Sequence, residues 1–266
     1  MSKINMTSQS LSVLLRSLRL PSFVTQHEEI ARQAEREGWG FSQYLQHLSE
    51  VELADREQRR THRLRKQSCL PVDKNLETLN LGHFSAKVRR QVPTLCDGAF
   101  VERAENILAF GLPGRGKTHL LCAIGHELVN RGHRVFFTPA YRLVQRLLIA
   151  KRDLLLEQEL RKLDRYAVVI LDDIGYIQQD RDEMEVLFTF LGERYERRSV
   201  MISSNLVFSQ WDRIFKDPMT TAAAIDRVVH HSTILELTGE SVRGRVARRR
   251  NAALGKKTVK KNRGKK

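Results

Sequence analysis

The amino-acid sequence predicts an α/β fold, in which a small all-α N-terminal domain precedes a five-stranded parallel sheet covered by helices. Three observations support this prediction. Five apolar runs of strand length recur through residues 101–244 and alternate with helical patterns, as in a doubly wound sheet. A glycine-rich loop lies between the first of these runs and an amphipathic helix. Leucines at helical spacing mark the region before residue 70.

The N-terminal region, residues 1–70, is expected to be helical. Its first apolar stripe ends at Pro21, and a second follows the break at Gly38 and Gly40. The stripes consist of Leu11, Leu14, Leu15 and Leu18, and then of Tyr44, Leu45, Leu48 and Leu53. Pro71 closes the region, and we expect residues 71–100 to be a connector into the core.

Residues 101–244 are expected to form the core domain. Its predicted strands are nearly continuous in hydrophobicity, which is typical of strands that helices cover on both faces. They are Asn106–Phe110, Val135–Phe137, Ala167–Leu171, Val200–Ser203 and Thr233–Leu237. Between the first two strands, Leu120, Ile124 and Leu128 indicate a helix that Gly132 ends.

The chain is strongly basic, with 46 lysines and arginines against 31 acidic residues and a net charge of +15. Such an excess favours a polyanionic partner, DNA or RNA, over an anionic membrane surface. Six basic side chains cluster in residues 56–66, and we expect them to contact the phosphates of duplex DNA without sequence preference. They are Arg56, Arg59, Arg60, Arg63, Arg65 and Lys66. Residues 245–266 form a basic tail that we expect to be disordered until bound.

Several classes of protein are disfavoured by the composition. No stretch approaches the ~18 consecutive apolar residues of a membrane-spanning helix, and the N-terminus lacks the pattern of a secretory leader. The three cysteines Cys69, Cys96 and Cys122 are odd in number and widely spaced, which argues against a disulfide framework. We therefore expect a soluble, cytoplasmic protein with no membrane partner.

The loop GLPGRGKT fits the pattern G-x-x-x-x-G-K-[ST]. Its glycines allow backbone N–H groups to approach phosphate oxygens, Lys117 places a charge near the β and γ phosphates, and the Thr118 hydroxyl can ligate magnesium. The helix that begins here adds the positive end of its dipole. We expect a purine nucleoside triphosphate, ATP with Mg²⁺, to be bound. The expected contacts are Gly111, Leu112, Pro113, Gly114, Arg115, Gly116, Lys117, Thr118 and His119.

Polar side chains follow two later strands of the predicted sheet. Asp172 and Asp173 end the run AVVILDD, and Asn205 ends VMISSN. Carboxyl ends of parallel strands face the ligand crevice, so Asp172 is expected to hold magnesium together with Thr118. Asp173 would orient or deprotonate the attacking water, and Asn205 would position that water against the γ-phosphate.

Together these residues resemble the AAA+ superfamily, and within it the IstB/DnaC-like branch of transposition helpers and helicase loaders. The stretches ILDDIGYI, SSNLVFSQWDRIF and AIDRVVHHSTILELTGESVRGR look like the C-terminal half of IstB-type helpers. SLRLPSF and FSQYLQHLSEVELADREQRR resemble that family's helical DNA-binding region. The resemblance covers nearly the whole chain except the basic tail, and it fits IstB better than DnaC.

The resemblance implies an AAA+ ATPase core and further roles by position. Asn205 would be the sensor on the fourth strand, and Arg243 a second sensor that contacts nucleotide in its own subunit. Arg227 would be the arginine finger that reaches the nucleotide of a neighbouring subunit, although an Asp–Arg pair on a helix is usually a surface charge pair. Asp173 departs from the family, since AAA+ proteins more often carry Glu there. The shorter side chain would slow hydrolysis or favour a switch-like ATP cycle.

Three functions remain open. By the resemblance, the chain is an ATP-dependent, DNA-binding helper of the transposase encoded by the same element. It would oligomerise with copies of itself on duplex DNA and hydrolyse ATP to regulate target selection and transposition. A helicase-loader ATPase of the DnaC type is the alternative from the same branch. A non-catalytic DNA architectural protein with ATP as assembly ligand is the alternative of another class, and Asp173 and Arg227 argue against it.

The adjacent histidines His230 and His231 are not expected to bind a metal. Neighbouring residues of a helix or strand point to different faces, and no set of cysteines or carboxylates accompanies the pair.

Overall fold

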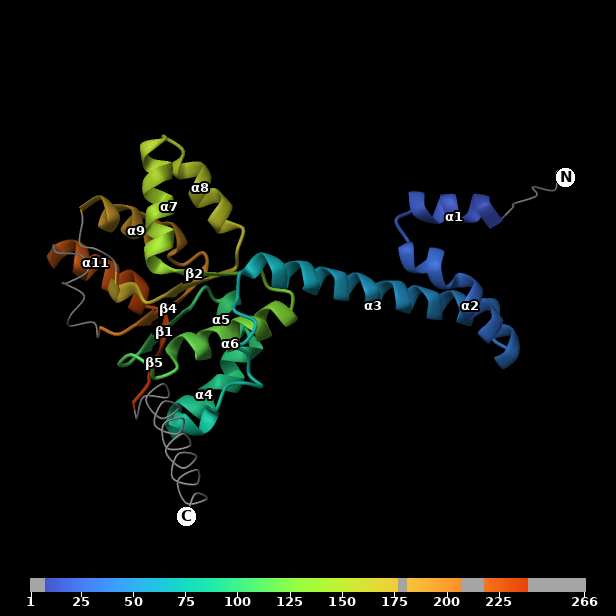
Figure 1. The fold of residues 1–266 in the computed structure, drawn as a ribbon, viewed down its shortest axis with the longest axis horizontal. Helices are drawn as coiled ribbons and strands as arrows, with labels where there is room; N and C mark the ends of the chain where they lie inside the picture. The colour runs from blue at the N-terminus through green and yellow to red at the C-terminus, as the bar shows by residue number, and fades with distance from the viewer. Residues whose placement is uncertain (1–7, 177–180, 207–217, 239–266) are drawn as a thin grey trace, which may run out of the picture. The chain divides into compact units, whose positions relative to one another are not determined.

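The computed structural model describes residues 8–176, 181–206 and 218–238 and divides into two compact units, residues 1–63 and 64–266 (Figure 1). The first unit contains α1 (Ser8–Ser17), α2 (Pro21–Glu37) and most of α3 (Phe41–Ser68). The division therefore falls inside α3, whereas the predicted N-terminal region ends at residue 70. Arg243 and the basic tail, residues 245–266, lie outside the described residues.

The N-terminal helices are joined by a buried carboxylate. Pro21 does more than end a helical run, because it occupies the first turn of α2, where its missing N–H costs no hydrogen bond. Leu20 precedes α2 and offers no side-chain cap. The backbone N–H of Ser22 instead donates to Glu52 of α3 at 2.8 Å, so this carboxylate takes the place of a cap.

The second unit is the predicted α/β core. Its first part comprises η1 (Leu81–His83), α4 (Ala86–Asp97), α5 (Ala99–Glu102), β1 (Asn106–Phe110), α6 (Lys117–Asn130), β2 (Val135–Pro139), α7 (Ala140–Arg152) and α8 (Leu156–Asp164). Its second part comprises β3 (Val168–Asp172), η2 (Ile174–Tyr176), α9 (Arg181–Arg194), β4 (Ser199–Ser204), α11 (Pro218–Val229) and β5 (Ser232–Glu236). The strands pair in parallel in the order β2-β3-β4-β1-β5. The predicted five-stranded parallel sheet is confirmed.

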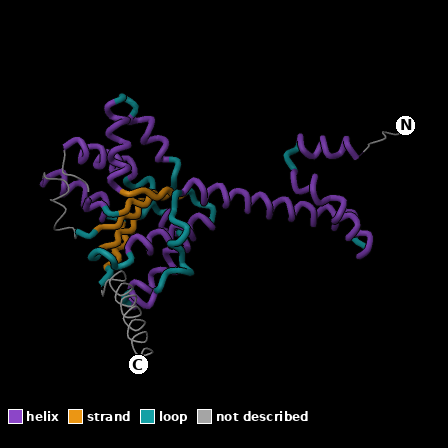
Figure 2. Tube along the Cα trace, in the orientation of Figure 1, coloured by secondary structure: helices purple, strands orange, loops and turns teal. Residues whose placement is uncertain are grey.

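Helices cover both faces of this sheet, as Figure 2 shows. Alternation along the strands divides the core in two: Ile107 and Ala109 of β1 pack into one cluster, and Leu108 and Phe110 into the other. The first cluster contains the buried face of α6 and residues of α4. The second contains buried residues of α7 and α9. This three-layer arrangement leaves the carboxyl ends of the strands open to a ligand.

Residues 71–100 do more than connect the two regions. Apolar side chains from this stretch are buried in the same cluster as α6 and β1. They are Leu79, Phe84, Val88, Val92, Leu95, Cys96 and Phe100. Ser85 caps α4 by accepting a hydrogen bond from the backbone N–H of Val88. The stretch is therefore part of the core domain.

Within the described residues, no helix combines the length and the apolar character that a membrane crossing requires.

Candidate nucleotide-binding site

The glycine-rich loop lies at the carboxyl end of β1 and leads directly into α6. Gly116 has φ +86°, a left-handed conformation that disfavours any side chain, and it immediately precedes α6. A Cβ on Gly111 would meet the main-chain oxygen of Leu237 at 2.5 Å, so this position also requires glycine. The backbone thus turns tightly enough to expose its N–H groups at the start of a helix, which is the geometry of an anion site.

Lys117 is the first residue of α6 and is 5% exposed. Its ammonium group donates to the main-chain oxygens of Gly111 at 2.7 Å and Leu112 at 3.3 Å. These bonds hold the positive charge inside the loop, where a phosphate group would need it.

A hydrogen-bond network joins α6 to the ends of β3 and β4. The hydroxyl of Thr118 donates to Oδ1 of Asp172 at 2.7 Å, and the hydroxyl of Ser203 donates to the same oxygen at 2.6 Å. Ser203 also accepts a bond from the backbone N–H of Asp173 at 2.8 Å. The hydroxyl and carboxylate oxygens of Thr118 and Asp172 therefore lie together, and oxygens are the ligands that Mg²⁺ prefers. The donor set fits magnesium.

Sequence reasoning missed Ser203. The signal in the sequence was its position at the end of the predicted strand Val200–Ser203. In the structure this strand lies next to β3, with Ile202 opposite Leu171.

A cavity of about 270 Å³ lies in front of the loop. Its lining residues are Lys74, Thr78, Leu79, Asn80, His83, Phe84, Pro113, Gly114, Arg115, Gly116, Lys117, Thr118, His119 and Asp173. Most of the predicted nucleotide contacts are thus brought together with Asp173. Gly111 and Leu112 do not line the cavity, but their main-chain oxygens accept hydrogen bonds from Lys117.

The second wall of this cavity comes from residues 74–84, which no sequence motif had marked. His119 ties this segment to α6, because its Nε2 lies 3.0 Å from the hydroxyl of Thr78 and 3.2 Å from the main-chain oxygen of Asn75. Phe84 packs so closely on the loop that a Cβ on Gly116 would lie 3.3 Å from its ring. A nucleotide bound by the loop would therefore also meet residues that precede β1.

Asn205 follows β4 directly, next to the network of Ser203. Its side-chain oxygen is buried and has no hydrogen-bond partner within the described part of the chain. The side chain lies against Gly175, where even a Cβ would collide with it. Asn205 does not line the cavity itself.

Arg227 lies away from this cavity, on α11. Its guanidinium group stacks over the ring of Phe188 on α9 at 4.5 Å from the centroid. Gly192 also lies on α9, and a Cβ at this position would lie 2.9 Å from Nη1 of Arg227. The absence of a side chain on Gly192 therefore makes room for the arginine. Within its own subunit, Arg227 therefore packs on α9.

The six predicted DNA-binding residues are all exposed on α3, but Arg56, Arg59 and Arg65 also make hydrogen bonds within the chain. Arg56 donates to Glu52 at 2.7 Å and to the main-chain oxygen of Arg19, and Arg59 donates to Glu52 at 3.2 Å. Burial raises the pKa of Glu52, but hydrogen bonds from Arg56 and Ser22 outweigh it and lower the pKa below its ordinary 4.5. Arg65 donates to Asn130 of α6 at 2.7 Å.

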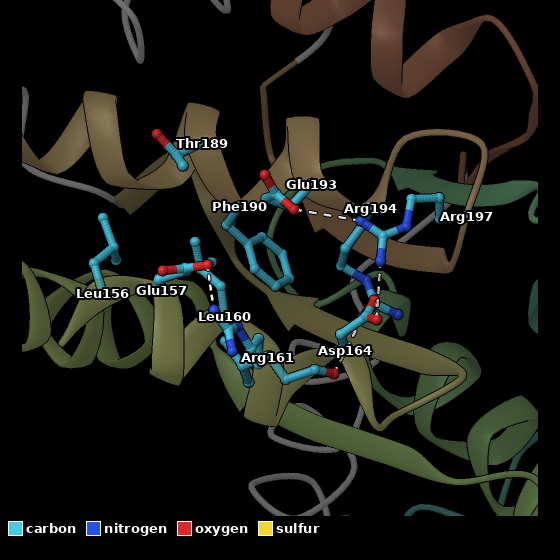
Figure 3. A pocket seen from close by; sticks show the side chains of 11 residues that line it. Leu156, Glu157, Leu160, Arg161, Asp164, Thr189, Phe190, Glu193, Arg194 and Arg197 are labelled. Carbon is cyan, nitrogen blue, oxygen red and sulfur yellow. Dashed lines mark hydrogen bonds and ion pairs between the residues drawn. The ribbon is translucent and has the colours of Figure 1, made fainter.

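A larger cavity of about 570 Å³ lies between α8 and α9, apart from the glycine-rich loop (Figure 3). Its charged side chains are engaged with one another: Arg161 pairs with Glu157, and Arg197 pairs with Asp164 at 3.2 Å and Glu193 at 3.4 Å. The buried Arg194 donates to main-chain oxygens of α8, of the loop before β3 and of β4. These interactions hold helices and strands together, so we assign this cavity to the framework.

Comparisons with known proteins agree with the geometry. The family described as IstB-like ATP binding protein matches residues 13–251. An insertion-sequence ATP-binding protein of Sinorhizobium fredii is 44% identical over 238 residues, which cover 89% of this chain and 80% of the relative. The IS21 ATP-binding protein of Pseudomonas aeruginosa is 38% identical over 88% of each chain.

Two solved structures share the fold. AMPPCP-bound DnaA from Aquifex aeolicus has a TM-score of 0.55 at 18% identity, covering 71% of this chain and 57% of DnaA. DnaI has a TM-score of 0.54 at 20% identity, covering 64% of this chain and 96% of DnaI. At these identities the likeness concerns the fold of the core alone. The family match over residues 13–251, together with the two insertion-sequence relatives, shows that the chain belongs to the IstB-like ATP-binding proteins, as its motifs predict.

Proposed function

We propose that this protein binds and hydrolyses ATP with Mg²⁺ and serves as the DNA-binding helper of the transposase encoded by the same element. It would form a homo-oligomer on duplex DNA and regulate target selection through its ATP cycle. The observation that carries the proposal is the network in which Thr118, Asp172 and Ser203 meet beside the glycine-rich loop. The names of its relatives, which are insertion-sequence ATP-binding proteins, support the transposition context.

The residues around the cavity divide the task of holding ATP. Backbone N–H groups of the loop and Lys117 would bind the phosphates, and the wall of residues 74–84 would enclose the rest of the nucleotide. Thr118 and Asp172 would hold Mg²⁺, which neutralises charge on the phosphates when it is bound.

Hydrolysis requires a base and a positioned water. Asp173 lines the cavity and would accept the proton of the attacking water. The buried oxygen of Asn205, which follows β4 directly, is an acceptor that a water molecule can satisfy. Arg227 would stabilise the transition state in a neighbouring subunit.

The DNA contact would use one face of α3. Arg59, Arg60, Arg63 and Lys66 follow one another at spacings of one, three and three residues, so they share a face of the helix, and all are exposed. Arg56 lies on the same face but also donates a hydrogen bond to Glu52. Arg63 and Lys66 are therefore the two positions best suited to test DNA binding.

The first experiment compares nucleotide binding and ATP turnover, with and without DNA. Lys117→Ala should weaken ATP binding by about 10–100-fold, because it removes a charge-assisted contact with phosphate. Asp173→Asn should bind ATP normally but lose turnover by about 10²–10⁴-fold. The exposed Lys87→Ala and Asp97→Asn are matched controls that should behave as wild type. Normal turnover in Asp173→Asn would remove that residue from the mechanism.

The second experiment measures the slope of log DNA affinity against log salt. Arg63→Ala/Lys66→Ala should make this slope shallower by about 2, since each phosphate contact contributes about 0.9. Lys87→Ala/Arg89→Ala removes the same charge from an exposed part of α4 and should change the slope little. A flat slope for the wild type, or an equal loss in both double variants, would contradict a DNA-binding face on α3.

A further inference from the structure

The turn after α9 and the turn between α11 and β5 bring together three side chains that ligate metals. Glu196 comes from the first turn, and His230 and His231 come from the second. Each offers one ligand atom, and these atoms lie within 4.8 Å of one another. A carboxylate oxygen and two imidazole nitrogens form a set typical of zinc-type sites.

The two histidines converge because they lie in neither a helix nor a strand. They form the turn between the end of α11 and the start of β5, and their ring centroids are 4.1 Å apart. The expectation that adjacent histidines point apart holds only within regular structure, and the carboxylate missing from their sequence surroundings comes from residue 196.

The backbone anchors all three residues. The N–H of His230 donates to the main-chain oxygen of Asp226 on α11 at 2.9 Å, and the main-chain oxygen of His231 accepts from the backbone N–H of Asn106 on β1 at 2.7 Å. The turn that contains Glu196 is hydrogen-bonded to the end of α9, because the N–H groups of Arg197 and Arg198 donate to the main-chain oxygen of Arg194. The ligand positions are thus set by hydrogen bonds that do not involve the ligating side chains.

The side chains of this cluster already lie close to one another. Oε1 of Glu196 lies 3.6 Å from Nε2 of His231. The hydroxyl of Tyr195 lies 3.1 Å from Nδ1 of His230 and orients that ring, as outer partners of ligating histidines do. The nearby Arg197 is paired with Asp164 and Glu193, so its charge is already balanced.

We propose that Glu196, His230 and His231 bind one divalent cation of the zinc type, with water completing its coordination. All three residues are exposed, so a cation and its water have access. We do not expect Mg²⁺ or Ca²⁺ to bind here, because these cations favour sites built only from oxygen ligands. The bound cation would tie the end of α11 to the turn after α9.

This site is distinct from the nucleotide site. It lies where β4 and β5 begin, whereas the glycine-rich loop and the two aspartates lie at the ends of β1 and β3. With strands of five residues the two edges are about 15 Å apart. Nucleotide binding therefore serves as an independent check that a variant of the cation site is folded.

The test is a titration of tag-free, full-length protein with Zn²⁺ against a chromophoric chelator, and with Co²⁺ followed by absorption. Wild type should bind one equivalent, in the presence of saturating Mg²⁺. His230→Ala, His231→Ala and Glu196→Gln should each weaken binding at least about 10-fold, and Tyr195→Phe should have a smaller effect. Zn²⁺ should also slow hydrogen exchange in α11 of the wild type only.

His62→Ala and Cys69→Ser are the matched controls, since both residues are exposed and could bind Zn²⁺ adventitiously. They should retain the full affinity. His230→Asn and His231→Asn repeat the test if an alanine variant fails to bind ATP. Affinity that is unchanged in the Glu196 and histidine variants, affinity lost in Cys69→Ser, or no stoichiometric binding by the wild type would each overturn the proposal.

Discussion

Ser203 shows how much one buried hydroxyl can organise. It donates to Asp172 and accepts from the backbone of Asp173, so it sets the positions of both aspartates at once. The left-handed backbone of Asp173, with φ +56°, is a conformation that a non-glycine residue adopts only with support. The bond to Ser203 supplies part of that support and directs the Asp173 side chain to the nucleotide cavity.

Ser203→Ala should therefore reduce ATP turnover by about 10-fold or more while ATP affinity changes little. The loss of one hydrogen bond to a charged group is worth about 1.5–3 kcal/mol, and here it acts on the residues expected to hold Mg²⁺ and activate water. Steady-state kinetics against ATP and Mg²⁺ concentration provide the measurement. Ser204→Ala is the control, because this equally buried neighbour bonds only with Leu206 among the contacts described for its side chain. Equal losses in both variants would indicate a general effect on β4.

At the scale of elements, the strands were predictable and some helices were not. Strands buried on both faces leave continuous apolar runs, so each predicted strand lies within two residues of its observed bounds. α4 has an apolar stripe of Val88, Val92, Leu95 and Cys96 at helical spacing, but Pro93 in its interior and several basic residues obscure the helix in the sequence. Its burial depends on α6, a partner that only the tertiary structure provides.

The same limit applies to the site. The phosphate loop and the two aspartates are local motifs, and sequence spacing was enough to find them. The wall of residues 74–84 has no motif of its own, since it lines the cavity only because Phe84 and Thr78 pack against the start of α6. Glu196 and the two histidines are 34 and 35 residues apart in sequence, and only the fold brings them together.

The junction of α2 and α3 leads to a prediction about pH. Glu52 has a folded-state pKa below its ordinary 4.5, owing to hydrogen bonds from Arg56 and Ser22 that outweigh burial. Its charged form therefore stabilises the folded helices at neutral pH, and this contribution is lost as the pH falls below about 4.5. Glu52→Gln should speed hydrogen exchange in α2 at pH 7, and the difference from wild type should shrink towards pH 3.

Glu50→Gln is the matched control, because Glu50 is exposed two residues away and bonds with Gln46 on its own helix. It should leave exchange in α2 unchanged at both pH values. A pH-independent difference between Glu52→Gln and wild type would mean that the side chain acts through packing and not through its charge.

At the scale of the whole molecule, the placement of Arg227 bears on assembly. In its own subunit the arginine stacks on Phe188 and fills the space beside Gly192, and it does not line the nucleotide cavity. A structural role in joining α9 to α11 accounts for these contacts. A role in catalysis requires a second copy of the chain, so the two roles differ in what mixed assemblies should do.

Arg227→Ala should bind ATP but turn it over at least about 10³-fold more slowly if the arginine acts on a neighbouring subunit. Mixing it with Lys117→Ala protein on DNA should restore part of the activity, because the Lys117→Ala subunits still provide Arg227. The double variant Lys117→Ala/Arg227→Ala is the control partner and should restore none. Phe188→Leu removes the ring that holds Arg227 within its subunit, and should retain turnover. Absence of recovery in the first mixture, with Phe188→Leu as inactive as Arg227→Ala, would assign the arginine to packing within one subunit.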